Sequence, residues 1–240
     1  MNKVSISIFI ILTIWIIISF VFQPAEYLFP SFSSVVEDFI ENKEVFLENT
    51  YYTLIEVLIG FAIANILGLV IAIIAIYYTR IEQTLTMIAI MLKTVPIIAI
   101  APLLVLWFGH GIWSKVAAVT ITCFIPIFIN LVSGAKKVIR DYKDVINLYN
   151  LTKYQKTVHF ILPGVAPYLI SAIKISSSLA IVGALVSEFI SANKGLGYLI
   201  ISNYYSMNIA GVFVCIILSS FMGITIYYLC DYLEKKYITW

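Results

Sequence analysis

The side chains that most often carry chemistry are few in this sequence and stand far apart. The cysteines Cys123, Cys215 and Cys230 form no C-x-x-C pair, and His110 and His159 have no neighbouring ligand residues. A metal site needs several ligands together, and nucleophilic catalysis needs a base beside the nucleophile. The sequence also lacks the G-x-x-x-x-G-K-[ST] loop that binds nucleotide phosphates. We therefore expect no catalytic residue, no metal site, no cofactor and no nucleic-acid partner.

One short polar stretch has a strong helix signal, NLYNLTKYQKTVHFILPGVAP at residues 147–167. Thr152 and Gln155 have the spacing of a capping box, which starts a helix. Asp141 is a suitable N-cap for a preceding helix. That helix would end at Asn150, because asparagine tolerates the left-handed backbone conformation. The pattern predicts two short helices joined by a sharp turn.

Both predicted helices have an apolar face. The second would stop at Pro163, so each is shorter than the ~12 residues that an isolated helix needs in water. They must therefore dock on something. The lipid headgroup region and a groove on a soluble partner both suit such helices, and the residues alone leave this choice open. The apolar residues are Tyr142, Val145, Ile146, Tyr149, Tyr154, Val158 and Ile161.

The composition of the chain shows the surroundings in which these helices must lie. Of its 240 residues, 62% are hydrophobic and 12% are charged, and the mean hydropathy is +1.01. Such values lie outside the range of soluble globular proteins. Apolar runs of about 20 residues can cross ~30 Å of hydrocarbon as helices. We predict an all-α polytopic membrane helix bundle, a single domain over residues 1–240, with transmembrane helices at 4–22, 53–78, 84–106, 116–135, 167–190 and 209–230.

Lysine and arginine counts predict the orientation of these six helices. With the N-terminus inside, the inner segments hold ten of the 15 basic residues and the outer segments three, while Lys93 and Lys174 lie within spans. The positive-inside rule then places both termini and the loop 136–166 in the cytoplasm. The run 4–22 could be a signal peptide, but it is longer than a signal core and no small-x-small cleavage site follows it. We expect a retained helix.

The polar stretch also resembles a known motif. Residues from Asp144 to Pro163 resemble the cytoplasmic EAA loop of the permease subunits of ATP-binding-cassette (ABC) importers, roughly E-A-A-x-x-x-G, nine variable positions, hydrophobic residues and L-P. Asp144 stands where the Glu would be, and Asn150 replaces the Gly. Val145 and Ile146 replace the two Ala residues. These bulkier side chains imply a differently shaped socket.

Further stretches strengthen the resemblance. LKTVPIIAIAPLLVLWFGHGIWSK (92–115) is similar to the L-R-x-I-P-x-x-A-x-x-P-L-x-x-x-W-F-G-x-G-x-x-S-K signature of nitrate/sulfonate/taurine-type permeases, with Lys93 in place of Arg. FIPIFINLVSG (124–134) resembles that family's F-F-P-x-x-x-N-T-x-x-G. ALVSEFISANKGLGYLI (184–200) resembles its V-V-A-E…G-L-G run. The resemblance covers residues 30–240.

This resemblance implies a type I ABC importer permease-like fold and function. The chain would be the membrane-spanning subunit of a bacterial inner-membrane importer, surrounded by the lipid bilayer. It would form the path for a small solute delivered by an extracytoplasmic solute-binding protein. A separate ABC ATPase subunit would hydrolyse ATP, and a second permease subunit, which we expect to be an identical copy, would complete the path. ATPase coupling would involve Asp144, Val145, Ile146, Tyr149, Asn150, Thr152, Tyr154, Gln155, Val158 and Pro163.

Polar and helix-breaking residues within the spans are candidates for lining the path. A charge in hydrocarbon costs ~2.5–3.5 kcal/mol on insertion scales, so such residues usually have a role. Lys93 would lie mid-membrane if its span starts near Thr84, and at the surface if the span starts later. Lys174 lies near enough to the inner end for its ammonium to reach the surface. Glu56 and Glu188 fall near outer ends, and Glu56 stands where the family shows Arg. The path candidates are Lys93, Pro96, Pro102, Asn130 and Glu188.

Two other functional classes are the alternatives. An ion-coupled secondary transporter would use intramembrane carboxylates and often internal repeats, and the sequence has no convincing repeat. A membrane-embedded enzyme would need His, Asp, Glu or Cys clustered at one depth, and the charges are scattered. The sequence does not name the solute, because importers of nitrate, sulfonates, taurine and thiamine precursors share these motifs.

Overall fold

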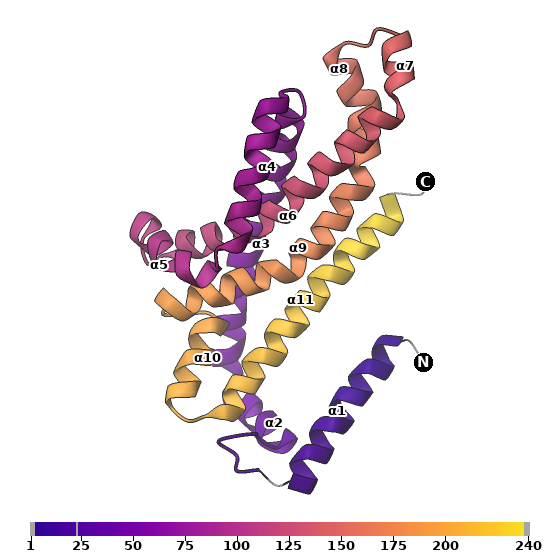
Figure 1. The fold of residues 1–240 in the computed structure, drawn as a ribbon. Coiled ribbons are helices and arrows are strands. Elements are labelled where there is room, and N and C mark those ends of the chain that lie inside the picture. The colour runs from indigo at the N-terminus through magenta and orange to yellow at the C-terminus, as the bar shows by residue number, and fades with distance from the viewer. Residues whose placement is uncertain (1–2, 23, 238–240) are drawn as a thin grey trace.

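The computed structural model describes residues 3–22 and 24–237, and every regular element in these ranges is a helix (Figure 1). This confirms the all-α prediction. The elements are α1 Lys3–Phe22, α2 Phe32–Glu41, α3 Lys43–Ala75, α4 Thr79–Thr94, α5 Ile97–Phe108, α6 Ile112–Asp141, α7 Lys143–Leu148, α8 Lys153–Lys156, the π-helical turn η1 Thr157–Ile161, α9 Leu162–Ser191, α10 Leu196–Tyr205 and α11 Ile209–Tyr237.

Four helical stretches in the described ranges are long and apolar enough to cross a membrane. They are Lys43–Ala75, Ile112–Asp141, Lys153–Ser191 and Ile209–Lys236, and the bent pair α4–α5 gives a fifth if it is one span. Each overlaps a predicted span. Helix α1 covers the predicted span 4–22, and its fully described apolar part, Thr13–Phe22, is shorter than a span. The structure thus supports four or five of the six predicted spans.

The predicted transmembrane helix 84–106 is two helices rather than one. Helix α4 ends at Thr94, α5 begins at Ile97, and their axes differ by 105°. Val95 and Pro96 between them have extended backbones. A proline disfavours helical conformation at the residue before it and has no N–H to donate, so the helix breaks at Pro96. Pro102 lies inside α5 without breaking it.

Helices α3, α6 and α9 form the centre of the bundle, with α6 packed along both of the others (Figure 1). Small residues allow the close approach. A Cβ at Gly60 of α3 would lie 2.6 Å from the Cβ of Val119 on α6, so only glycine fits at this crossing. Such small-residue contacts are typical of membrane helix pairs, where lipid provides no hydrophobic drive for association. The crossing fixes the middle of α3 against the first half of α6.

Helix α1 joins the bundle mainly through Trp15. The indole N–H of Trp15 donates to the carbonyl of Pro30 over 3.1 Å. The indole ring packs against Phe29, Phe32 and Phe213. This aromatic cluster holds the α1–α2 connection against the start of α11. The rest of α1 diverges from the bundle in Figure 1.

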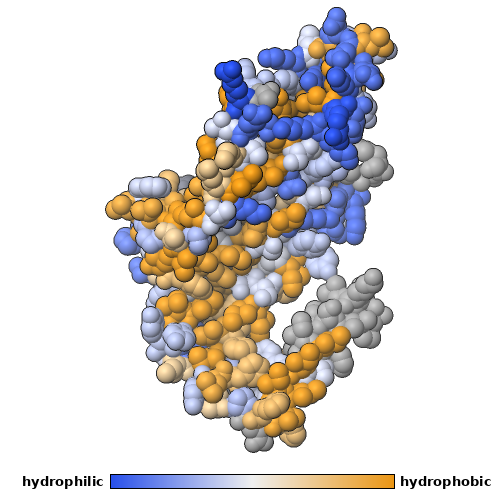
Figure 2. Space-filling view, viewed as in Figure 1, coloured by the Kyte–Doolittle hydropathy of each residue, from blue (hydrophilic) through white to orange (hydrophobic). Residues whose placement is uncertain are grey.

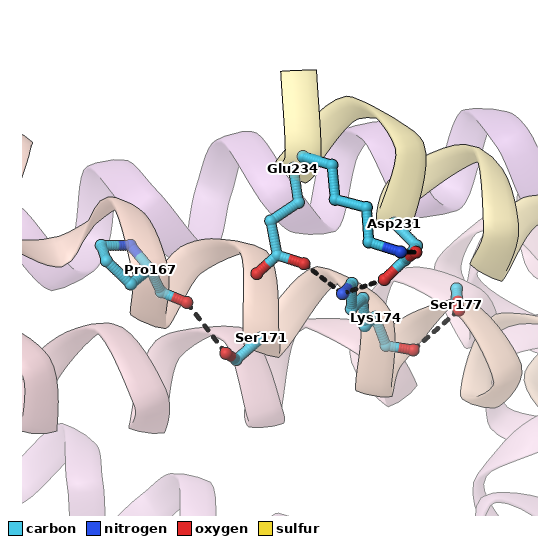
Figure 3. Close-up of polar contacts among 7 residues, drawn as sticks. Pro167, Ser171, Lys174, Ser177, Asp231 and Glu234 are labelled. Atoms are coloured by element: carbon cyan, nitrogen blue, oxygen red, sulfur yellow. Dashed lines mark hydrogen bonds and ion pairs between the residues drawn. The ribbon is translucent and has the colours of Figure 1, made fainter. Parts of the chain in front are cut away.

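An ion-pair cluster joins α9 to α11 (Figure 3). The ammonium of Lys174 on α9 pairs with the carboxylates of Asp231 and Glu234 on α11. The side chains of Lys174 and Asp231 are 18% and 19% exposed, so water screens the pair only partly. Asp231 also pairs with Lys235 over 2.7 Å. The ammonium of Lys174 is thus paired with carboxylates of a neighbouring helix.

Replacing Lys174 with methionine is expected to lower the free energy of unfolding by about 2 kcal/mol, because two partly buried carboxylates lose their partner. The measurement is unfolding of the purified chain in detergent or bicelles. Lys174→Arg should restore most of the loss. Lys137→Met, at an exposed lysine on α6, is the matched control and should have little effect. Equal stability of the Lys174 and Lys137 methionine variants would contradict a structural role for the cluster.

Candidate functional site

The two short helices predicted from the polar stretch are present as α7 and α8. Asn150 between them has a φ of 48°, which confirms the predicted left-handed turn. The amide of Gln155 donates to Thr152 Oγ1 over 3.3 Å, and the amide of Thr152 donates to Gln155 Oε1 over 3.0 Å. This reciprocal pair is the predicted capping box. It fixes the start of α8 immediately after the turn.

Two predictions about the ends of these helices are wrong. Asp141 is the last residue of α6 rather than an N-cap, because α6 continues to it and α7 follows after Tyr142. Asp144 nevertheless lies in the first turn of α7, as expected. Pro163 does not end the second helix. It is the second residue of α9, which directly follows the π-helical turn that joins α9 to α8.

A π-helical turn accounts for this continuity. In η1 the amide of Leu162 donates to the carbonyl of Thr157, five residues back. The helical hydrogen bonds therefore continue up to the residue before Pro163. Helices α8, η1 and α9 form one helical stretch, Lys153–Ser191. The second short helix, predicted to stop at Pro163, is therefore the start of a longer helix that is a candidate membrane span.

The outward face of α7 and α8 is apolar and exposed. Leu148, Tyr149 and Tyr154 are 80%, 70% and 75% exposed. Exposed apolar side chains in a polar setting are typical of a docking surface. Figure 2 shows that this end of the molecule, over α7, α8 and the adjoining ends of α4 and α6, is its most hydrophilic part. We call this face, made of Tyr142, Val145, Leu148, Tyr149 and Tyr154, the α7–α8 face.

Contacts with Tyr77, just after α3, hold α8 in place. The hydroxyl of Tyr77 donates to the carbonyl of Lys153 over 3.1 Å and also contacts the hydroxyl of Thr157. The ammonium of Lys153 lies 5.6 Å from the centre of the Tyr77 ring. A separate ion pair joins α6 to α4, between Lys136 and the buried Glu82 over 2.7 Å. Sequence reasoning missed these anchors, because no local pattern connects Tyr77 to a partner 76 residues away.

The predicted path residues are not brought together. Lys93 and Pro96 are exposed at the bend between α4 and α5. The side-chain amide of Asn130 donates to the carbonyl of Pro126 in its own helix over 2.8 Å. In the described part of the chain, no hydrogen bond or ion pair joins Lys93, Asn130 and Glu188. Glu188, in contrast, lies in a buried polar cluster near the other end of α9.

That cluster satisfies both oxygens of Glu188. Thr53 on α3 donates to Glu188 Oε1 over 2.7 Å, and the amide of Gly197 donates to Oε2 over 2.6 Å. The amides of Leu196 and Gly195 donate to Thr53 and to Asn49 of α3 over 2.8 and 2.6 Å. Gly195 has a φ of 111°, a conformation open to glycine. The sequence run E…G-L-G therefore encodes a turn that folds back onto its own glutamate.

Lys115 and Glu56 complete the cluster. The ammonium of Lys115 donates to the carbonyls of His110 and Ser191 over 2.8 and 3.0 Å, and it interacts electrostatically with Glu56 and Glu188. Lys115 is 2% exposed and Glu56 is 6% exposed. The basic residues counted in the outer segments include Lys115, and Glu56 was predicted near an outer end. The structure buries both side chains, that of Lys115 in the first turn of α6, which begins at Ile112.

Comparisons with known proteins agree with this architecture. Residues 64–239 match the family described as the binding-protein-dependent transport system inner membrane component. The chain is 33% identical over 215 residues to the formylaminopyrimidine transport permease protein ThiX of Halalkalibacterium halodurans, covering 89% of this chain and 86% of that protein. It is 30% identical over 159 residues to the riboflavin transport system permease protein RibX of Chloroflexus aurantiacus, covering 66% of this chain and 59% of that protein.

A third relative is the nitrate import permease protein NrtB of a Synechocystis strain. The two chains are 23% identical over 240 residues, covering 96% of this chain and 87% of that protein. The family match extends from α3 through the α7–α8 face to α11. The chain therefore belongs to the family of binding-protein-dependent inner-membrane components, and it is the multi-pass permease of an ABC transport system rather than its ATPase.

Proposed function

We propose that the chain pairs with a second, identical permease subunit to form the path of a small solute into the cell. A binding protein outside the membrane delivers the solute, and a separate ATPase supplies the energy. In this arrangement α1 and the α4–α5 pair complete six transmembrane spans, and both termini face the cytoplasm. The basic residues around α7 and α8 support this orientation under the positive-inside rule. The alternative of an ion-coupled carrier does not agree with the family match.

The observation that carries the proposal is the α7–α8 face. It consists of exposed aromatic and aliphatic side chains on two helices whose turn is fixed by a left-handed residue and a capping box. A rigid apolar helix end of this kind suits a groove on a soluble partner. Its direct continuation into α9 supports transmission of ATPase movement to the membrane part. The residues proposed for coupling remain those expected from the sequence, with Leu148 and Tyr142 added.

The names of the relatives do not agree on one solute. They are named for formylaminopyrimidine, riboflavin and nitrate. These names have only transport in common. The proposal for this chain therefore concerns transport and its coupling to the ATPase. We propose a small polar solute without choosing among these compounds.

Cross-linking tests the docking proposal. A benzophenone attached to Tyr149→Cys or Tyr154→Cys, in a background lacking the three native cysteines, is expected to capture the ATPase subunit in the assembled transporter. Tyr205→Cys is the matched control, because Tyr205 is 79% exposed on α10, far along the chain from the α7–α8 face. It should not capture the ATPase. Capture of lipid alone, or of this chain alone, from positions 149 and 154 would overturn the proposal.

A further inference from the structure

Two glutamates from different helices meet inside the buried cluster of Glu188. Glu56 lies on α3 and is 6% exposed, and Glu188 lies on α9 and is 1% exposed. Thr53 donates to Glu188 Oε1 over 2.7 Å, and Glu56 follows Thr53 by three residues on the same face of α3. The carboxyl groups of Glu56 and Glu188 are hydrogen-bonded to each other. The fold therefore brings two acidic groups into direct contact away from water.

A hydrogen bond between two carboxyl groups needs a hydrogen atom. Two carboxylates are both acceptors, so a fully ionised pair would have no donor and would repel. The ammonium of Lys115 acts on both Glu56 and Glu188, and its charge balances one carboxylate. A second carboxylate would be a buried charge without a counterion, which is costly. One proton on the pair makes the cluster neutral and supplies the missing hydrogen.

The surrounding hydrogen bonds indicate which carboxyl group carries this proton. Glu188 accepts at both oxygens, from Thr53 over 2.7 Å and from the amide of Gly197 over 2.6 Å. Such hydrogen bonds stabilise the ionised form of a carboxyl group. Oε2 of Glu56, in contrast, is buried without a hydrogen-bond partner. A protonated Glu56 is neutral and can donate to Glu188, so the geometry places the proton on Glu56 and the negative charge on Glu188.

The other titratable groups that face Glu56 do not replace the proton. They line a cavity of about 230 Å³ beside it and are Tyr52 of α3, His110 of the α5–α6 turn, Lys115 of α6 and Lys194 of the α9–α10 turn. Lys194 pairs with Glu48 over 2.8 Å, and Lys115 donates to backbone carbonyls. In the described part of the chain, none of them donates to Glu56 Oε2. The cavity is open to solvent, so water can exchange protons with its polar lining.

The two carboxyl groups lie where α3 meets the start of α10. The amide of Gly197 donates to Glu188, and the amide of Leu196 donates to Thr53 over 2.8 Å. The hydrogen bond from Glu56 to Glu188 joins α3 to α9 at the same place. Without the proton, two like charges in contact would repel and would push α3 away from α9 and α10. The proton therefore keeps this junction closed.

We propose that Glu56 and Glu188 form a proton-binding site, which holds one proton at neutral pH and so keeps α3 joined to α9 and the start of α10. Raising the pH far enough transfers the proton to water and opens the junction. The proton belongs to the folded chain and is not transported. This inference goes beyond the function proposed above and does not depend on it, because neither the ATPase nor the solute takes part.

Infrared spectroscopy of the full chain tests the proton directly. The detergent is a maltoside, which has no carbonyl group. A protonated carboxyl group has a carbonyl stretch that carboxylates lack and that shifts in heavy water. We expect this band in the wild type at neutral pH, where an exposed glutamate, with a pKa of about 4.3, is ionised. Glu56→Gln should remove the band, and Glu37→Gln, at an exposed glutamate of α2, is the matched control and should keep it.

A comparison of two glutamine variants tests the position of the proton. Glutamine at position 56 keeps a donor toward Glu188, as a protonated glutamate does. Glutamine at position 188 has one acceptor oxygen for the two donors of Thr53 and Gly197. Glu188→Gln should therefore have an unfolding equilibrium constant at least about tenfold larger than that of Glu56→Gln. Equal stability of the two variants would overturn the assignment of the proton to Glu56.

The pH dependence of unfolding tests the role of the proton. Above about pH 5 an unfolded chain has lost the proton of Glu56 while the folded chain keeps it, so stability falls as the pH rises. Relative to Glu56→Gln, the wild type should unfold up to about tenfold more readily for each pH unit until the folded chain also releases the proton. Parallel pH profiles of the two proteins would overturn the proposal. Absence of the infrared band from the wild type would overturn it even if Glu56→Gln fails to fold.

Discussion

Replacing Asn150 with valine should reduce ATP-dependent uptake about five- to thirtyfold while membrane insertion stays normal. The α7–α8 turn holds Asn150 at a φ of 48°, and a β-branched residue resists this conformation. The strain is about 1–2 kcal/mol, which shifts a conformational equilibrium by roughly that factor. The variant should therefore present the α7–α8 face to the ATPase in the wrong geometry. The measurement is solute uptake into proteoliposomes containing the complete transporter, with ATP inside.

Two further substitutions make this test specific. Asn147→Val lies three residues earlier, at an exposed position inside α7, where helical backbone suits valine apart from a small propensity cost. It should transport nearly as well as the wild type. Asn150→Gly keeps the left-handed conformation and should also retain uptake. Normal uptake by Asn150→Val, or equal loss in all three variants, would show that the turn is not what couples the subunits.

Replacing Lys115 with methionine should have the largest effect on stability, about 3–5 kcal/mol, because it leaves buried carboxylates and three carbonyl acceptors without their cation. The ammonium is within 3.4 Å of the carbonyls of His110, Gly111 and Ser191, which belong to two separate turns. Its loss should loosen the α5–α6 turn from the end of α9. Unfolding of the purified chain in detergent or bicelles measures the difference.

Lys43→Met is the control for this effect, since Lys43 is exposed at the start of α3. It should change stability by less than about 0.5 kcal/mol. A Lys115→Met protein as stable as the Lys43 control would mean that the cluster is not held together by charge.

The sequence predicted features that depend on nearby residues. Residues such as Asn150, Thr152 and Gln155 determine a turn and a cap within a few positions, so these were predicted correctly. The bend at Pro96 is also encoded locally, but hydropathy averages over a run, so the boundaries 84–106 combine two helices in one span. Pro163 shows the opposite error, because a π turn before it lets the helix continue.

Features that depend on distant residues could not be predicted in the same way. Lys115 is near one end of an apolar run, and counting charges assigns such a residue to the surface. Its burial follows from carbonyls of the α5–α6 and α9–α10 turns, which only the fold brings together. The contact of Tyr77 with α8 likewise joins segments that no periodicity relates. The single Glu in the run ALVSEFISANKGLGYLI was identified as a candidate, whereas its partners Thr53 and Glu56 were not.

The π turn η1 also sets the angular phase between α8 and α9. A regular helix advances about 100° for each residue, so a turn that holds one extra residue rotates everything before it by about that angle relative to everything after it. The direction in which Tyr154 points, relative to the membrane-buried side of α9, is therefore set by the five residues Thr157–Ile161. Deleting one residue there would leave both helices intact. It would nevertheless rotate the docking side chains by about a quarter of a turn relative to the groove that they are proposed to enter.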